Sequence, residues 1–392
     1  MRMVEPATQS ISPSARWLDS APNRLLVLLL TFLAFGILMM TSASVEVASS
    51  QYGDPFFFTR RQLFFSVVGL VAVFITVQVP LRVWYQNSGL MLLAVAFLLL
   101  LVLIPGVGTV VNGSARWIDL GFYRLQPSEL GKIFLVIYMA AFLQRRHREV
   151  REDWSGFVKP VAVIAAMALM LQLEPDHGAM VIVVAAGFGM LFLGGARLHR
   201  FLLVVLLGVL AIVGLALTRP YVISRLTSFL NPWASEYVYG EGYQLTQALI
   251  AFGRGEWFGA GLGNSLQKLY FLPEAHTDFV VAIIAEELGV PGILLVIVLF
   301  SLLVATAMRT GRKAERYGQR FGAFVAYGIA ILFSSQAFIN LGVNTGLLPT
   351  KGLTLPFFSY GGNSLLASCF MVALLMRIQY ETALAGRQGG GR

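Results

Sequence analysis

A short polar stretch, residues 273–278, stands directly before a long apolar segment and includes Glu274, His276, Thr277 and Asp278. Each of these four side chains can transfer a proton or form a hydrogen bond. A carboxylate at the edge of a lipid bilayer costs free energy unless it has a partner or a task. Two interpretations follow from the residues alone. Thr277 or Asp278 caps the following helix, or Asp278 is a general base held where water meets lipid.

Other charged residues lie within or beside apolar segments and are further candidates for chemistry. Glu129 and Lys132 are one helical turn apart, so they share a face and can pair in a low-dielectric bundle. They form either a structural ion pair or part of a functional cavity. Asp176, at the end of an apolar segment, is either a helix cap or a site residue. His177 and His276 lack the spacing of a metal-binding motif, so no metal site is predicted.

The composition places these residues in a membrane protein. Of 392 residues, 57% are hydrophobic and 12% are charged, whereas soluble domains carry roughly 25% charged residues. Repeated apolar segments are long enough to cross a bilayer core of ~30 Å. The fold class is therefore predicted to be an all-α polytopic membrane protein. The net charge of +9 is explained by Lys and Arg in cytoplasmic loops rather than by a nucleic-acid partner.

About ten transmembrane helices are predicted, with one large structured extracytoplasmic loop between spans 7 and 8. The spans are expected near residues 25–45, 62–79, 88–104, 126–143, 160–173, 178–193, 201–217, 279–308, 322–339 and 365–376. Gly and Pro at residues 289–292 are expected to break the eighth span, and residues 106–125 read as a Gly-rich loop. The predicted organisation is a cytoplasmic tail (1–23), a membrane domain (24–378) that includes the large periplasmic loop (218–278), and a C-terminal cytoplasmic tail (379–392).

The distribution of positive charge predicts the orientation of the chain. Ten spans place both termini on one side, and about 19 of the 29 Lys and Arg residues fall on that side. Both termini are therefore expected in the cytoplasm. The long loop and Asp278 then face outward.

Several stretches, in order along nearly the whole chain, resemble the SEDS (shape, elongation, division, sporulation) family. They are residues 111–117 (VNGSARW), 126–129 (QPSE) with Lys132, 174–178 (EPDHG), 261–268 (GLGNSLQK), 273–279 (PEAHTDF) and 356–364 (PFFSYGGNS). Residues 263–268, 273–275 and 349–353 resemble the division members more than the elongation members. Asn363 stands where many relatives have serine.

The resemblance implies a peptidoglycan glycosyltransferase that polymerises lipid II at the division septum of the bacterial inner membrane. Its implied partners are a class B penicillin-binding transpeptidase and other membrane proteins of the division machinery. By motif position, Asp278 matches the family's catalytic aspartate, and Glu129, Lys132 and Asp176 match the polar cavity beside it. The remaining candidate substrate-binding residues are Arg116, Glu274, His276, Thr277, Lys351 and Ser359. By analogy, the partner's transmembrane helix is expected against spans 8 and 9.

The implied reaction sets requirements that these residues can meet. A general base must take the proton of a GlcNAc 4-hydroxyl, and burial should raise the pKa of Asp278 and hence its basicity. Lys132, Arg116 or a divalent cation (Mg²⁺ or Mn²⁺) would offset the charge of the departing pyrophosphate. No cofactor is predicted with certainty. Direct displacement would invert C1 of MurNAc.

Two alternatives to a polymerase remain. A lipid II flippase needs a polar path across the membrane and commonly shows paired repeats. Here the polar residues gather on one side, which favours chemistry at the surface. A passive scaffold for division proteins would leave Lys132 and Asp278 unexplained.

Overall fold

The computed structural model describes residues 23–111, 114–121, 123–218, 227–350 and 352–389. Within these ranges a helix occupies each of the ten predicted spans. They are α1 (Asn23–Tyr52), α2 (Phe57–Gln78), α4 (Ser88–Val102), α5 (Pro127–Arg145), α7 (Trp154–Leu173), α8 (His177–Leu193), α9 (Leu198–Thr218), α12 (Val280–Arg316), α13 (Arg320–Asn344) and α14 (Gly362–Gly389). Six of them are long and apolar enough to cross a membrane, and α4 and α8 are shorter apolar helices. The prediction of a multi-pass all-α membrane protein is confirmed.

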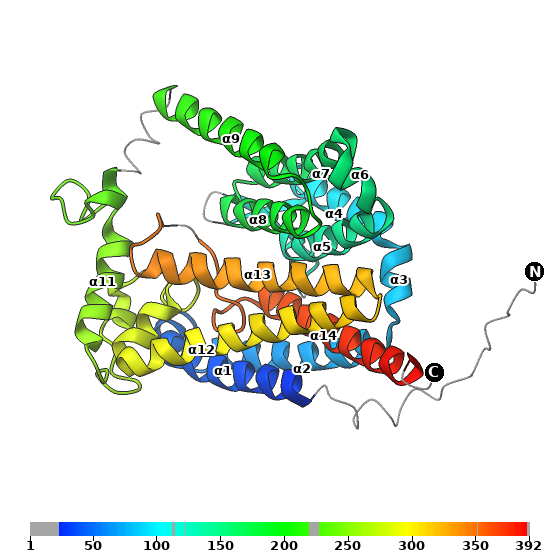
Figure 1. Cartoon of the computed structure of the whole chain (residues 1–392). Coiled ribbons are helices and arrows are strands. Elements are labelled where there is room, and N and C mark those ends of the chain that lie inside the picture. The colour runs from blue at the N-terminus through cyan, green and yellow to red at the C-terminus, as the bar shows by residue number, and fades with distance from the viewer. Residues whose placement is uncertain (1–22, 112–113, 122, 219–226, 351, 390–392) are drawn as a thin grey trace, which may run out of the picture.

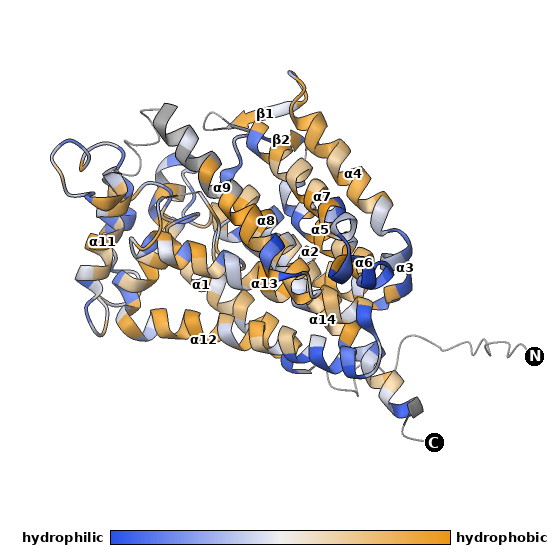
Figure 2. Cartoon of the chain, turned by 45° about the horizontal axis from the view of Figure 1, so that its top comes forward, coloured by the Kyte–Doolittle hydropathy of each residue, from blue (hydrophilic) through white to orange (hydrophobic). Residues whose placement is uncertain are grey.

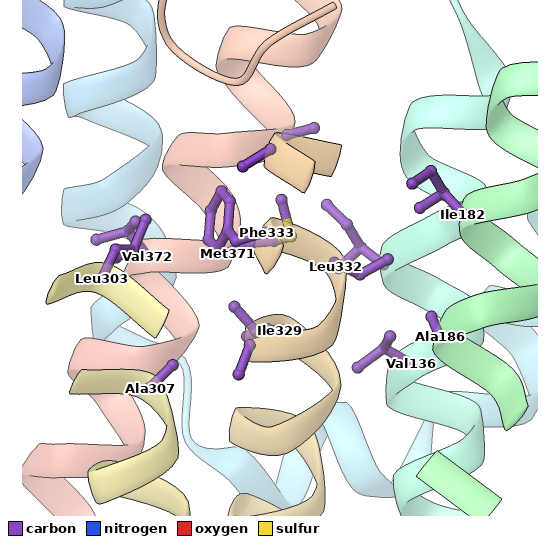
Figure 3. Close-up of a cluster of buried hydrophobic side chains, with 14 of the residues drawn as sticks. Val136, Ile182, Ala186, Leu303, Ala307, Ile329, Leu332, Phe333, Met371 and Val372 are labelled. Carbon is purple, nitrogen blue, oxygen red and sulfur yellow. The ribbon is translucent and has the colours of Figure 1, made fainter. Parts of the chain in front are cut away.

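Helix α13 lies at the centre of the bundle (Figure 1). In the most apolar 18-residue stretch of α13, 72% of the residues are buried by the described part of the chain, whereas in α12 the share is 33%. Figure 3 shows α13 between two pairs of helices: Phe333 lies on the side of Leu303 (α12) and Met371 (α14), and Leu332 on the side of Val136 (α5) and Ile182 (α8). Because α13 is apolar on most of its circumference, it is buried by other helices, whereas α12 keeps a face for lipid.

Helix α12 is broken where the sequence predicted, at Gly289. This residue has φ 63° and ψ −152°, which a side chain would strain. The loop before α12 packs into the break: Ala260 and Gly261 donate backbone hydrogen bonds to the carbonyls of Glu286 and Glu287, at 2.8 and 3.0 Å. A Cβ on Gly289 would lie 2.5 Å from the backbone nitrogen of Gly259 in this loop. The break is therefore the docking point of the loop.

Residues 106–125 were expected to be a loop, and this expectation is wrong in part. They contain an antiparallel sheet in the order β1 (Gly108–Val111), β2 (Ser114–Asp119) and β3 (Arg124–Leu125). The β-branched residues at 109–111 favour a strand, a signal that the glycines nearby obscured. The sheet presents Arg116 at the same end of the bundle as Asp278. Residues 112, 113 and 122 lie outside the described ranges.

The long connection between α9 and α12 is folded, as predicted. It contains α11 (Tyr243–Gly255) and a short π-helix, η1 (Gln267–Phe271). In Figure 1, α11 lies at the left end of the bundle, at the N-terminal end of α12. Residues 219–226 of this connection lie outside the described ranges.

A buried charge cluster fastens this connection to the bundle. Lys268 Nζ lies 2.9 Å from Glu287 Oε1 of α12 and 3.3 Å from the hydroxyl of Ser42 of α1. That hydroxyl also donates to Glu287 at 2.7 Å. Glu286 accepts from Arg254 of α11 at 2.7 Å and from the backbone nitrogen of Leu266 at 2.9 Å. Both glutamates are fully buried, so the cluster joins α1, α11 and α12 through paired charges.

The opposite end of the bundle carries two short helices that the sequence reading missed, α3 (Leu81–Gln86) and α6 (His147–Glu152). Helix α14 continues to Gly389, so most of the predicted C-terminal tail is helical. The predicted N-terminal tail lies outside the described residues apart from its last residue.

Candidate functional site

Asp278 lies at the end of the bundle where α12 begins, in the turn before that helix. It does not cap that helix, because the N-cap is Phe279 and no side chain caps the terminus. The capping interpretation is therefore wrong for both Thr277 and Asp278. Instead, two side chains of α13 hold the backbone carbonyl of Asp278: Asn340 Nδ2 at 3.0 Å and Asn344 Nδ2 at 3.1 Å. Asn344 also accepts from the backbone of Ala282 in the first turn of α12, at 3.1 Å.

The carboxyl group of Asp278 is a weaker acid than an ordinary aspartate. Burial raises its pKa to about 7, and the negative charges of Glu274 and Asp176 raise it further, whereas Arg116 acts in the opposite direction. Gly352, which follows Lys351, packs against this carboxyl group: a Cβ on Gly352 would lie 3.0 Å from Asp278 Oδ2. Asp278 is thus an ionisable group that exchanges its proton near neutral pH.

Asp176 connects two helices beside Asp278. As the N-cap of α8 it accepts from the backbone nitrogen of Ala179 at 3.2 Å. Its other oxygen accepts from the hydroxyl of Ser128 at 3.0 Å and from Gln126 Nε2 at 3.5 Å. The cap interpretation holds, and the same carboxylate also fixes the first turn of α5 against α8.

Glu129 and Lys132 form the ion pair expected from their spacing. Lys132 Nζ lies 2.8 Å from Glu129 Oε1, and the two side chains are 5% and 10% exposed. Among the described residues, no hydrogen bond or ion pair joins Lys132 to Asp278 or to Asp176. The printed contacts therefore leave the Glu129–Lys132 pair separate from Asp278, whereas Asp176 and Arg116 act on the charge of Asp278.

Arg116 connects the small sheet to these helices. Its Nη2 donates to the carbonyl of Pro175 at 2.6 Å, which places the guanidinium beside the turn between α7 and α8. Its Nε is buried and has no hydrogen-bond partner among the described residues. Arg116 lowers the pKa of both Asp278 and Glu174, whereas the negative charge of Asp176 raises both.

Glu174 is a site residue that the sequence analysis passed over. It is fully buried, and both of its carboxylate oxygens lack a hydrogen-bond partner within the described ranges. Burial raises its pKa to about 8, Asp176 raises it further, and Arg116 lowers it. Glu174 therefore holds its proton at neutral pH. The sequence could have indicated this residue, because a glutamate stands directly before Pro175 at the end of an apolar segment.

The remaining candidates near Asp278 have structural partners. The hydroxyl of Thr277 donates to Glu274 Oε2 at 2.6 Å. The His276 ring lies 4.9 Å from the ring of Phe58, and its backbone carbonyl accepts from Tyr360 at 2.8 Å. Burial lowers the pKa of His276, against the effect of Glu274. His276 joins this turn to α2 and to the segment before α14.

Three further residues complete the account of the predictions. Ser359 accepts from the backbone nitrogen of Leu355 at 2.7 Å, so its hydroxyl closes a turn of its own segment. Asn363 accepts from the backbone of Gln126 at 3.0 Å and donates to the carbonyl of Arg124 at 2.8 Å, which joins α14 to the start of α5. Lys351 lies outside the described residues.

The carboxylates at this end do not form a metal cage. The described residues contain no group of three or more His, Cys, Asp or Glu side chains that could hold a metal ion. Mg²⁺ is often held by one or two carboxylates together with substrate phosphates. The described carboxylates fit a site of this kind, in which the substrate supplies the other ligands, and not a site built from protein ligands alone.

The sequence matches one protein family over most of its length. The family of cell cycle proteins that comprises FtsW, RodA and SpoVE matches residues 23–384. A probable peptidoglycan glycosyltransferase FtsW of Pseudomonas fluorescens is 51% identical over 353 residues, which are 90% of this chain and 86% of the relative. A probable peptidoglycan glycosyltransferase FtsW of Nitrosococcus halophilus is 54% identical over 350 residues, 89% of this chain and 90% of the relative.

Solved structures share the fold. A chain of a peptidoglycan synthase complex, described as coordinating polymerization and crosslinking, superposes with a TM-score of 0.76 at 27% identity, over 93% of this chain and 99% of that one. The rod-shape-determining protein RodA of Thermus thermophilus gives 0.67 at 27% identity, over 94% and 99%.

Proposed function

The chain belongs to the FtsW, RodA and SpoVE family of cell cycle proteins, and on this premise we propose that it is a peptidoglycan glycosyltransferase that polymerises lipid II, with Asp278 as the general base. The activity is that of its FtsW relatives, which cover most of the chain. The observation that supports the role of Asp278 is a carboxyl group with a pKa of about 7 in the turn before α12, where Glu274, Arg116 and Asp176 act on its charge.

The reaction transfers one proton, forms one bond and breaks another. Asp278 takes the proton of the GlcNAc 4-hydroxyl as that oxygen forms a bond to C1 of the MurNAc donor. The bond from C1 to the pyrophosphate oxygen breaks, and the prenyl pyrophosphate leaves with its electron pair. A pKa near the working pH suits this task, because the base form is populated and still basic. Asn340 and Asn344 act as positioning residues, since they hold the backbone of Asp278.

The departing pyrophosphate needs positive charge. Arg116 supports this role, because its Nε has no partner among the described residues and its charge acts on Asp278. Lys132, held by Glu129 near the start of α5, is a second candidate cation. A divalent cation bound between the pyrophosphate and one of these carboxylates would add charge of the same kind.

The location follows from the same premise. We propose that the chain lies in the bacterial inner membrane at the division septum, with both termini in the cytoplasm and Asp278 facing the periplasm. The bias of Lys and Arg supports this orientation. Lipid II would keep its prenyl tail in the bilayer while its sugars reach Asp278.

The expected partner is a class B penicillin-binding transpeptidase of the division machinery. The peptidoglycan synthase complex with the shared fold joins polymerization to crosslinking, which supports a crosslinking partner here. Its transmembrane helix is proposed to pack against α12 and α13. Both keep exposed apolar side chains, among them Ile297 and Phe338.

The test compares variants of the full-length chain, purified with the transpeptidase and supplied with lipid II. Asp278→Asn and Asp278→Ala should lower glycan synthesis by about 10²–10⁴-fold, the usual contribution of a general base. Asp119→Asn is the matched control: this exposed aspartate lies at the same end of the bundle and pairs with Arg124. Normal synthesis by both Asp278 variants would remove Asp278 from its role.

The flippase alternative has its own measurement. Lipid II transport is followed in vesicles that contain wild type or Asp278→Asn. Transport by wild type without any glycan synthesis, under conditions where the transpeptidase is present, would favour a transporter. Synthesis that depends on Asp278 favours the transferase.

A further inference from the structure

The end of α12 farthest from Asp278 carries a group of positive charges that the proposed reaction does not use. Four cations and a tyrosine line a hollow of about 630 Å³, here called the basic hollow: Arg309, Arg312, Lys313, Arg316 and Tyr317. Figure 2 shows the hydrophobic middle of α12 giving way to a hydrophilic C-terminal end. The ring of Tyr317 packs on α14, since a Cβ on Gly386 would lie 3.0 Å from it.

Within the described ranges, no carboxylate neutralises the charges of the basic hollow. Across the described part of the chain, none of the four cations pairs with a carboxylate. Glu315, the acidic residue nearest in sequence, instead accepts from the hydroxyl of Tyr327 at 2.9 Å. Four like charges that line one hollow repel one another, so a bound anion would stabilise this end of α12.

An apolar stripe on α12 runs directly into the basic hollow. Leu295, Val298 and Leu302 are 43%, 49% and 48% exposed. Their spacing of three and four residues places them on one helical face, and Arg309, seven residues after Leu302, continues that face. Arg316 follows after another seven residues. The stripe and the cations are thus one continuous surface, apolar at one end and basic at the other.

The dimensions of α12 place the basic hollow at one face of the bilayer and the stripe in its hydrocarbon core. A helix rises about 1.5 Å per residue, so Arg309 lies about 30 Å from the break at Gly289. This is the thickness of the hydrocarbon core, ~30 Å, and it puts Arg309 at the level of the headgroups. Leu302 and Leu295 then lie roughly 10 and 20 Å deeper along the helix.

We propose that the basic hollow binds the phosphate headgroup of an anionic phospholipid, with an acyl chain of that lipid along the stripe of Leu295, Val298 and Leu302. Arginine binds phosphate through paired hydrogen bonds, and basic pockets at the ends of membrane helices attract anionic lipids. The site lies at the opposite end of the bundle from Asp278. It is a lipid-binding site in addition to the proposed transferase activity.

The test measures retention of lipid by the full-length chain in detergent, by native mass spectrometry. The probes are phosphatidylglycerol with long acyl chains, phosphatidylcholine with the same chains, dihexanoyl phosphatidylglycerol and inorganic phosphate. The test variant is R309Q/R312Q/R316Q, and its charge-preserving partner replaces the same three arginines by lysine. The control R146Q/R148Q/R151Q removes three cations from the same end of the bundle, around α6.

Wild type is expected to retain long-chain phosphatidylglycerol in preference to phosphatidylcholine. Each cation removed should weaken binding about fivefold, so the glutamine variant, which lacks three, should lose about 100-fold in affinity. The lysine variant and the control should keep most of the affinity. An equal loss in the control would show diffuse attraction to basic loops and overturn the site. Binding of dihexanoyl lipid or inorganic phosphate as tight as that of the long-chain lipid would overturn the role of the stripe. No loss in the folded glutamine variant, with unfolding temperature as the check, would overturn the proposal outright.

Discussion

Replacing Glu274 by glutamine should move the pH dependence of glycan synthesis to lower pH. The carboxylate of Glu274 is exposed and is the charged group that most raises the pKa of Asp278, after burial itself. The glutamine keeps an oxygen that can accept from Thr277 but removes the negative charge. Asp278 should then lose its proton at a lower pH, because its ionised form no longer faces a like charge.

The wild-type profile sets the size of the effect. With a pKa of about 7, roughly one tenth of Asp278 is ionised at pH 6 and roughly nine tenths at pH 8, so the rate should rise about tenfold across that interval. An ordinary aspartate, with a pKa of about 3.9, would give a flat profile there. Glu274→Gln should therefore raise the rate at pH 6 and change it little at pH 8.

Arg116→Gln provides the opposite perturbation. Arg116 lowers the pKa of Asp278, so its removal should move the midpoint to higher pH, whatever it does to the maximal rate. Because Arg116 is also proposed to face the pyrophosphate, the midpoint of the profile is compared rather than its height. Asp119→Asn, which removes an exposed charge from the same sheet, should leave the midpoint unchanged.

The assay is lipid II polymerisation by the chain with its transpeptidase, measured as kcat/KM from pH 5.5 to 8.5 at constant ionic strength. The profile of kcat/KM reports ionisations of the free enzyme. A flat wild-type profile would refute the perturbed pKa. A midpoint that moves upward in Glu274→Gln would refute the stated cause.

Three further variants test the buried charges. Lys132→Met should lower stability by about 3–5 kcal/mol, since it leaves Glu129 buried without its partner, and adding Glu129→Gln should restore thermal stability but not synthesis. Glu174→Gln should be more stable than wild type by up to ~3 kcal/mol at pH 7, because a group with a pKa of about 8 when folded and 4.5 when unfolded makes folding less favourable as pH rises between those values. Lys268→Met should leave Glu287 unpaired and make the loop before α12 more sensitive to protease.

Each of these has a contrary result. A double variant at 129 and 132 that is stable and fully active would make the pair purely structural. Equal unfolding temperatures of wild type and Glu174→Gln from pH 5 to pH 8 would show that Glu174 is not held protonated. A loop that stays protected in Lys268→Met would mean that the glycine contacts at the break hold it without the ion pair.

The sequence was sufficient for the elements whose signal is local. The lengths of the apolar segments predicted ten spans, because a helix satisfies all of its backbone hydrogen bonds within the segment that crosses the lipid. The spacing of Glu129 and Lys132 predicted their ion pair, since residues three apart share a helical face. The glycine and proline at 289 and 291 predicted the break in α12.

The tertiary structure decided what depends on partners far apart in the chain. Asp278 does not cap a helix; its backbone carbonyl is held by Asn340 and Asn344, more than sixty residues later. The raised pKa of Glu174 follows from burial, which its local sequence does not encode. Burial and charge–charge interactions depend on distances between packed helices. A linear pattern therefore identified most of these ionisable groups, though not Glu174, and none of their protonation states.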